Sequence, residues 1–202
     1  MKRKVDFVWL EGYLEENAAR RLLNCVGFDT GNAVFAVAGG NGEFWKGMGR
    51  RDASAKAGLT VVALGDLEQE ACPPALIRRH LPHGPAPGFV LRLAVRMLEG
   101  WLMADREQMA AFLKCPLAKV SQCPDLLEHP KKELVNLARR FGTRAIKADI
   151  VPEAGHSGLA GKGYRIRMAE FIDRRWRPRE AALQSPSLQR ALRALDRLSG
   201  RL

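Results

Sequence analysis

The chain has 202 residues and a formal net charge of +11, from 33 Lys and Arg against 22 Asp and Glu. This length suffices for one domain with a sizeable core, so the fold needs no disulfide or structural metal. The four cysteines include no C-x-x-C pair, which argues against a zinc knuckle. No run approaches the roughly 20 apolar residues that span a membrane, and no signal peptide is recognisable. A soluble, cytoplasmic protein without membrane contact is predicted.

The positive charge is concentrated in the second half of the chain. Residues 1–100 carry 13 basic and 11 acidic side chains, whereas residues 101–202 carry 20 and 11. This asymmetry favours an acidic partner for the second half, and nucleic acid, either DNA or RNA, is the first candidate. A well-solvated surface is the alternative explanation.

In chain order, apolar runs predict strands first and helices later. Continuous apolar runs are typical of parallel strands covered on both faces, and amphipathic spacing predicts the helices. The strands are expected at 5–10, 33–38, 59–64 and 89–95, and the helices at 15–23, 97–104, 106–113, 131–141, 164–176 and 187–198, the last capped by Ser187. The alternation predicts an α/β fold with a mainly parallel sheet, followed by a mostly helical C-terminal half.

Acidic residues follow two of the predicted strands. Glu11 and Glu15 come after the first strand, and Asp66 and Glu68 come after the third. In an open parallel sheet, ligands bind beyond the carboxyl ends of the strands. Four carboxylates at that edge would repel one another without a cation, and their hard oxygens suit Mg²⁺ or Mn²⁺. The pattern predicts a divalent-metal site. Each pair also has a simpler interpretation, since Glu15 suits the first turn of a helix and Asp66 could cap the next helix.

These segments resemble a known pattern. Leu10-Glu-Gly-Tyr-Leu-Glu-Glu16 and Leu64-Gly-Asp-Leu-Glu68 resemble the Toprim domain, and the Glu11 to Glu15 spacing is similar to that in OLD-type nucleases. Further stretches, Cys72-Pro-Pro, Arg96 to Asp105, His129 to Leu134 and Ser185 to Leu188, resemble an uncharacterised bacterial family of stand-alone Toprim-like proteins. The Asp-Leu-Glu pair departs from the usual two aspartates of Toprim domains.

The resemblance implies a single Toprim-like domain with a Rossmann-like core at 1–105 and a basic helical extension at 106–202. It also implies Mg²⁺ or Mn²⁺ and phosphodiester chemistry. By position, Glu11 would be the catalytic acid or base, and Asp66 and Glu68 the main metal ligands. Glu15 and Glu99 would support a second ion.

Two of the implied roles have open alternatives. Lys131 or Lys132 would stabilise the transition-state phosphate, although a lysine at a helix start is more often a surface residue. Glu99 would serve a metal, although it could equally pair with Arg96 on a helix surface.

A glycine-rich loop at 155–163 precedes a basic helix. Lys162, Tyr164, Arg165 and Arg167 offer cations and a stacking ring to a nucleic-acid strand, and a flexible linker is the alternative. No dinucleotide fingerprint or P-loop is present, so no NAD or ATP site is expected. Cys72, His80 and His83 lack a fourth ligand at zinc spacing.

Two functions remain from the sequence. The first is a metal-dependent Toprim-type nuclease or phosphotransfer enzyme acting on nucleic acid, with phage defence as the setting that the resemblance implies. The alternative is a non-catalytic nucleic-acid-binding or regulatory subunit on a Toprim scaffold, serving a partner protein encoded nearby. A module that contacts an acidic protein is a third, more remote interpretation. The oligomeric state stays open.

Overall fold

A computed structural model describes residues 3–155 and 157–200. Four parallel strands form one sheet in the order β2-β1-β3-β4, with β1 at Phe7–Leu10, β2 at Val34–Val37, β3 at Val61–Asp66 and β4 at Phe89–Ala94. The α/β class, the parallel sheet and the helical second half are confirmed. Strands β1 and β3 are neighbours, and Leu10 pairs with Leu64, so their carboxyl ends meet.

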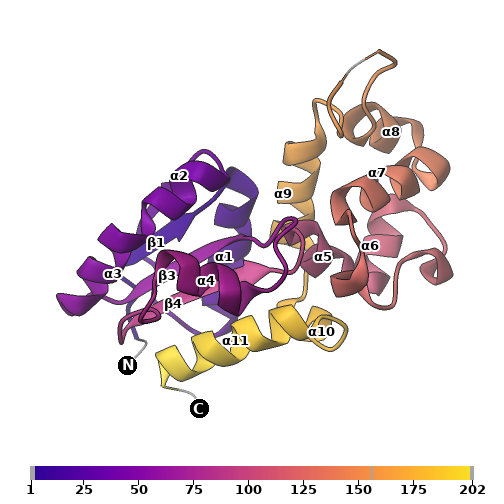
Figure 1. Ribbon diagram of the computed structural model, residues 1–202. Coiled ribbons are helices and arrows are strands. Elements are labelled where there is room, and N and C mark those ends of the chain that lie inside the picture. Colours follow the sequence, from indigo (N-terminus) through magenta and orange to yellow (C-terminus); the bar gives the residue numbers. More distant parts are fainter. Residues whose placement is uncertain (1–2, 156, 201–202) are drawn as a thin grey trace.

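Helices cover both faces of the sheet (Figure 1). Side chains alternate along each strand: Val62 and Leu64 join one core cluster, whereas Val61 and Ala63 join the other. The first cluster includes α1 (Tyr13–Cys25) and α11 (Pro186–Ser199). The second includes α2 (Asn41–Lys46), α3 (Met48–Lys56) and α4 (Pro73–His80).

The remaining helices pack beside the carboxyl end of the sheet and share the first core cluster. They are α5 (Leu98–Met103), α6 (Arg106–Leu113), α7 (Pro130–Phe141), α8 (Arg144–Ile150), α9 (Tyr164–Arg174) and α10 (Pro178–Ala181), with short 3-10 turns at Leu117–Lys119 and Pro124–Leu126. The C-terminal half is therefore joined to the strands by one continuous core. Among the described residues, no helix is both long and apolar enough to cross a bilayer.

The predicted cap of the last helix is wrong by two residues. Ser185, not Ser187, precedes α11, and its Oγ accepts a hydrogen bond from the backbone N–H of Leu188. Ser187 lies inside the helix, where its Oγ accepts a hydrogen bond from Trp101 Nε1 at 2.7 Å. Both serines match the helix-cap preference, and only the tertiary contact with Trp101 distinguishes them.

Candidate active site

Glu11 and Asp66 meet where β1 and β3 end. The Oε2 atom of Glu11 accepts a hydrogen bond from the backbone N–H of Asp66 at 2.9 Å. The parallel pairing of the two strands makes this contact possible, because it brings residues 55 positions apart to one edge of the sheet. The expected meeting of these two acids at the sheet's carboxyl edge is found.

Asp66 is buried, with 8% of its surface exposed. Its Oδ1 accepts a hydrogen bond from the backbone N–H of Leu98 at 2.8 Å, at the first residue of α5. The helix that follows in sequence, α4, begins instead after Cys72. Asp66 therefore serves a helix more than 30 residues away, and the simpler interpretation, a cap for the next helix, is wrong.

Glu99 lies on α5 and points inward. It is 4% exposed, and its Oε1 accepts a hydrogen bond from the hydroxyl of Tyr164 at 2.7 Å. Arg96 is bonded elsewhere, since its Nη1 donates to the backbone oxygens of Glu68 and Glu70. The alternative of a surface Glu99 paired with Arg96 is wrong, and Glu99 belongs to the buried acidic group.

Glu15 has the helix-start position that its sequence suggested, and it also lies close to other acids. It is the third residue of α1, and hydrogen bonds from its own backbone N–H and from that of Gly12 lower its pKa, as in a half capping box. The pKa-raising effect of burial is larger than the pKa-lowering effect of these hydrogen bonds, and the negative charges of Glu99 and Glu11 raise the pKa further. Together these effects raise the pKa of Glu15 to about 7.

The four carboxylates of Glu11, Glu15, Asp66 and Glu99, here called the acid cluster, act on one another. Burial raises the pKa of Asp66 well above its usual range, and the charges of Glu15, Glu99 and Glu11 raise it further. Burial also raises the pKa of Glu11. Like charges in a poorly solvated site disfavour joint ionisation, so burial and mutual repulsion act in the same direction on these carboxylates.

Glu68 is separate from the acid cluster. It is exposed, and its backbone lies in the left-handed region with φ 51°. Its charge still raises the pKa of Glu11, so it lies within electrostatic range. Asp66 is buried at the strand end, whereas Glu68 is exposed two residues later at a sharp turn of the backbone.

The structure distinguishes the two candidate lysines. The Nζ atom of Lys131, on the first turn of α7, lies 4.8 Å from the centroid of the Tyr164 ring, whereas Lys132 is exposed. Tyr164 therefore lies between Lys131 and Glu99, and this is a cation–π arrangement next to the acid cluster.

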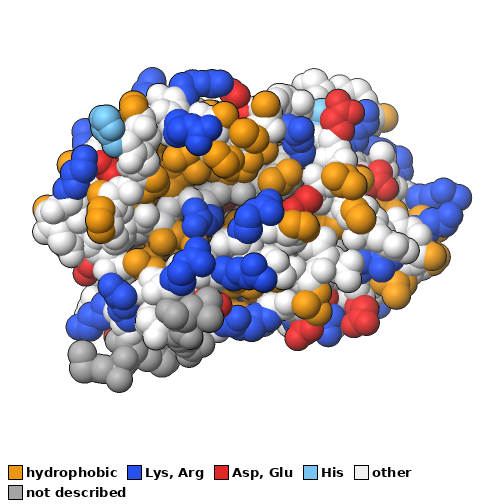
Figure 2. All heavy atoms as spheres, turned by 60° about the horizontal axis from the view of Figure 1, so that its bottom comes forward, with side chains coloured by type: hydrophobic (Ala, Val, Ile, Leu, Met, Phe, Trp, Pro, Cys, Tyr) orange, Lys and Arg blue, Asp and Glu red, His pale blue; other side chains and the backbone are white. Residues whose placement is uncertain are grey.

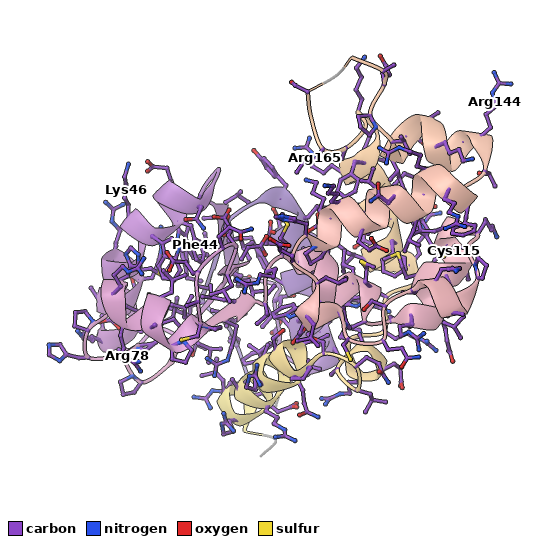
Figure 3. The ribbon with its side chains drawn as sticks, turned by 45° about the vertical axis from the view of Figure 1, so that its right-hand side comes forward. Phe44, Lys46, Arg78, Cys115, Arg144 and Arg165 are labelled. Carbon is purple, nitrogen blue, oxygen red and sulfur yellow. The ribbon has the colours of Figure 1, made fainter. Side chains whose placement is uncertain are left out.

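The four residues predicted to hold a nucleic-acid strand lie in different environments. Tyr164 is 4% exposed, so its ring is not accessible to stack on a base, and that expectation is wrong. Arg167 is engaged by Asp149 and Glu170, at 2.7 Å and 3.1 Å. Lys162 pairs with Glu153 at the surface. Arg165 is exposed and lies at the border of the two halves, while Arg144 projects from the far end (Figure 3).

Tyr13 is a residue that the sequence reasoning missed. Its ring is 60% exposed, it begins α1 between Glu11 and Glu15, and the guanidinium of Arg165 lies 5.0 Å from the ring centroid. An aromatic residue directly between two candidate ligands was the available signal. Of the two tyrosines, Tyr13 is the one with an exposed ring, and Tyr164 is buried.

Two glycines make room for the carboxylates. A Cβ at Gly65 would lie 2.7 Å from the Phe44 ring and 2.9 Å from Oε2 of Glu11. A Cβ at Gly12 would lie 2.7 Å from Oε2 of Glu15. Asn41, at the start of α2, adds a hydrogen bond that lowers the pKa of Glu11. Phe44 and Asn41 were not predictable as partners of Glu11 and Gly65, because they come from α2.

The acid cluster fits a divalent cation in its donor chemistry. Its hard oxygens and mutual repulsion are what Mg²⁺ or Mn²⁺ would relieve. Within residues 3–155 and 157–200, however, no group of three or more His, Cys, Asp or Glu side chains forms a ready-made metal site. A cation at this site would therefore require the carboxylates to rotate about their side-chain bonds.

Comparison of this chain with protein-family models, with curated proteins and with solved structures found no match.

Proposed function

We propose that the protein is a metal-dependent nuclease or phosphotransfer enzyme that acts on nucleic acid, and that the acid cluster is its active site. The observation that supports this most strongly is the concentration of Glu11, Glu15, Asp66 and Glu99 at the carboxyl edge of a parallel sheet, with the pKa values of Glu11, Glu15 and Asp66 raised. Strongly shifted carboxylates at such an edge are typical of functional sites.

In this proposal Asp66, Glu11 and Glu15 hold Mg²⁺ or Mn²⁺, with Glu99 as a further ligand. The bound ion would supply charge stabilisation for a phosphodiester and a more acidic bound water. Glu11, which is partly exposed and has a raised pKa, is placed to accept or return a proton at the edge of the site. Lys131 offers positive charge on the side of Tyr164.

The rim of the site has groups that suit a nucleic-acid strand. Tyr13 presents an open ring, and Arg165 lies over it, so a base could stack while the guanidinium meets a phosphate. Tyr13 lies between Glu11 and Glu15 in sequence, and Arg165 lies 5.0 Å from its ring centroid. These contacts replace the role that the sequence assigned to Tyr164.

Cleavage of labelled single- and double-stranded DNA and RNA with Mg²⁺ or Mn²⁺ tests the proposal. The parent protein is compared with a Glu11→Ala, Asp66→Ala double variant and with Glu43→Ala, an exposed acid paired with Lys46. We expect metal-dependent cleavage by the parent and by Glu43→Ala, and at least a 100-fold loss in the double variant. The metal should also raise the melting temperature of the parent but not of the double variant. Equal cleavage by all three proteins would overturn the assignment of the site.

One observation favours the second candidate, a non-catalytic nucleic-acid-binding subunit. The described residues contain no ready-made ligand set of three, and Asp66 and Glu99 are already hydrogen-bonded. This candidate predicts salt-dependent binding of the same oligonucleotides by the parent and the double variant, with no cleavage and no shift of melting temperature on adding metal.

A further inference from the structure

A groove runs along the outer edge of β4, on the side of the sheet away from β3. It has a volume of about 700 Å³ and is lined by α4, β4 and α11. On the face of the molecule that carries α11, Lys and Arg side chains gather beside a hollowed band of hydrophobic side chains (Figure 2). The groove is separate from the acid cluster and shares no lining residue with it.

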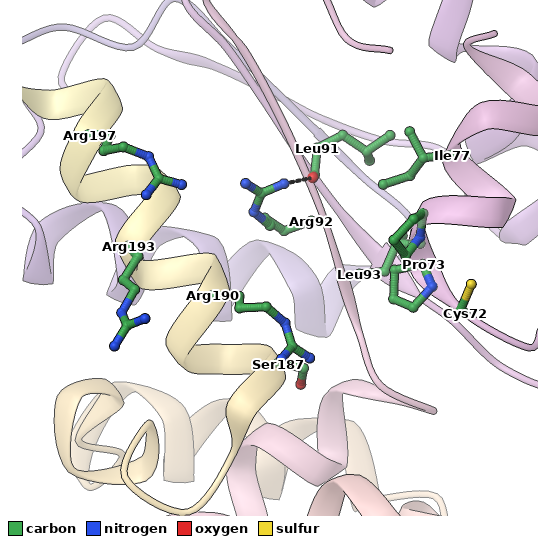
Figure 4. A pocket seen from close by; sticks show the side chains of 11 residues that line it. Cys72, Pro73, Ile77, Leu91, Arg92, Leu93, Ser187, Arg190, Arg193 and Arg197 are labelled. Carbon is green, nitrogen blue, oxygen red and sulfur yellow. Dashed lines mark hydrogen bonds between the residues drawn. The ribbon is translucent and has the colours of Figure 1, made fainter. Parts of the chain in front are cut away.

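One wall of the groove is basic. Arg190, Arg193 and Arg197 project from successive turns of α11, and Arg92 projects from β4 between them and the edge of the sheet (Figure 4). None of the four has an acidic partner within the described part of the chain. Asp196, the acid on α11, is turned away and holds Arg179 at 2.9 Å. Burial lowers the pKa of Arg92, and the charges of Arg197 and Arg190 lower it further.

The opposite wall is apolar. Pro73, Pro74 and Ile77 of α4 line it, and Leu91 and Leu93 form the floor. No aromatic side chain lines the groove among the described residues, so it offers no platform for base stacking. An apolar wall facing a basic wall favours a peptide over a nucleic-acid strand.

The floor of the groove is the outer edge of β4, which has no neighbouring strand among the described residues. Leu91 is 0% and Leu93 4% exposed, so a pairing strand must displace the Arg92 side chain from the Leu91 oxygen. The oxygens of Gly88 and Ala94 accept hydrogen bonds from Val61 and Leu67 on the β3 side. Because backbone groups alternate in direction along a strand, those of residues 89, 91 and 93 face the groove. Phe89 N–H donates to Ala86, and the oxygen of Leu91 accepts from Arg92 Nη1 at 2.7 Å. The N–H groups of Leu91 and Leu93 have no partner in the described residues.

We propose that this groove binds an extended, acidic segment of a partner protein, which pairs with β4 as a fifth strand. Alternate side chains of a strand point to opposite faces, so one set would meet the arginines of α11 and the other would meet Pro73 and Ile77. The six residues of β4 accommodate a segment of similar length. The preferred sequence therefore alternates acidic and apolar residues. This binding mode does not depend on the proposed enzymatic activity.

Selection from a displayed library of random ten-residue peptides tests the charge and the pattern. The parent protein is the bait. Peptides that also bind an Arg190→Glu, Arg193→Glu variant are discarded, because they bind the protein outside the groove. Arg139→Glu, Arg140→Glu on α7 makes the same change of charge at exposed positions outside the groove. We expect enriched peptides with alternating acidic and β-branched residues, bound at least tenfold more weakly by the α11 variant but equally by the α7 variant. No enrichment, or enrichment without acids, would overturn the proposal.

Amide exchange tests the strand pairing directly. With the best selected peptide bound, exchange at Leu91 and Leu93 should slow at least tenfold, whereas Val90 and Arg92, already paired to β3, should change little. Two versions of the peptide are compared, one methylated on the backbone nitrogens of its odd residues and one on those of its even residues. Only one of these sets of N–H groups faces β4, so only one version should lose binding. Unchanged exchange at Leu91 and Leu93 would contradict strand addition. A different outcome is that the α11 variant binds every selected peptide as well as the parent does and loses only the binding of a (dT)12 oligonucleotide. That outcome would contradict the peptide proposal and assign the groove to nucleic acid.

Discussion

Two like-charged groups lie in this molecule, and their surroundings differ. The acid cluster is enclosed by β1, β3, α5 and α9, and two of its members, Asp66 and Glu99, are buried. The arginines of the β4 groove lie on an open face, and Arg190, Arg193 and Arg197 are exposed. All four carboxylates of the acid cluster come from the first half of the chain, whereas the groove combines Arg92 of the first half with three arginines of the second. The comparison indicates that burial, more than the number of like charges in a cluster, decides whether the cluster must bind a proton or a counterion.

The largest expected effect is the pH dependence of stability that the acid cluster causes. The pKa of Glu15 rises from 4.5 to about 7 on folding. Because the pKa of Glu15 is higher in the folded than in the unfolded protein, its contribution to stability is fully present when the pH is below the unfolded-state pKa. This contribution is lost as the pH rises through the folded-state pKa of about 7. Between pH 5 and pH 8, without divalent metal, we expect a loss of roughly 2–3 kcal/mol from this group.

Thermal unfolding of Glu15→Gln against pH measures this loss, because the amide cannot ionise. Its melting temperature should fall less steeply than that of the parent between pH 5 and pH 8. Glu16→Gln is the matched control, since Glu16 pairs with Arg20 on the surface at 2.8 Å. Identical pH slopes for the parent and Glu15→Gln would show that Glu15 is ordinarily solvated.

Filling the space beside the acid cluster should also be costly. In Gly65→Ala the new Cβ would lie within 3 Å of the Phe44 ring and Glu11 Oε2, so we expect a loss of about 1–3 kcal/mol. Gly49→Ala on α3 has nothing within 4 Å of the new Cβ and should be neutral or stabilising by up to about 1 kcal/mol. Urea denaturation of both variants compares them, and equal stability would mean that the site is looser than the structure indicates.

A smaller effect is expected from the hydroxyl of Tyr164. Tyr164→Phe removes the hydrogen bond to Glu99, which should cost about 1–2 kcal/mol because the acceptor is buried. Tyr13 is the other tyrosine of the chain and is exposed, so Tyr13→Phe should change stability by less than about 0.5 kcal/mol.

The Tyr13→Phe variant leaves Tyr164 as the sole tyrosine, and its absorbance can be followed during an alkaline titration. Burial and the charge of Glu99 raise the pKa of Tyr164 well above 10. Ionisation near 10 in the folded variant would contradict the buried contact with Glu99.

The smallest effect is expected at the β4 groove. Arg190→Gln and Arg193→Gln remove exposed charges without acidic partners, so each should change the free energy of unfolding by less than about 0.5 kcal/mol. Any gain from reduced repulsion should shrink as salt rises from 0.05 M to about 0.5 M. A loss above 1 kcal/mol would show that these arginines support the fold, and the contrast with the acid cluster would then fail.

The sequence predicted the strands and the amphipathic helices well, because both depend on local apolar patterns. All four expected strands occur, and α6, α7 and α11 lie within about one residue of the expected ranges. Helices α4, α8 and α10 were not predicted, and neither were α2 and α3, where Gly39, Gly40 and Gly42 signal a loop. Phe44 and Met48 stabilise them by packing on the sheet, which overrides the local preference.

By itself, the sequence determined which residue types are present and where the chain leaves the sheet, and so it placed Glu11 and Asp66 at strand ends. Only the tertiary structure decided which side chains meet. Glu99 turned inward to Tyr164, Glu68 stayed outside, Tyr13 took the exposed position, and Arg92 joined the arginines of α11. The physical reason is that charge repulsion, burial and pairing depend on distance in space, and residues far apart in the chain supply them.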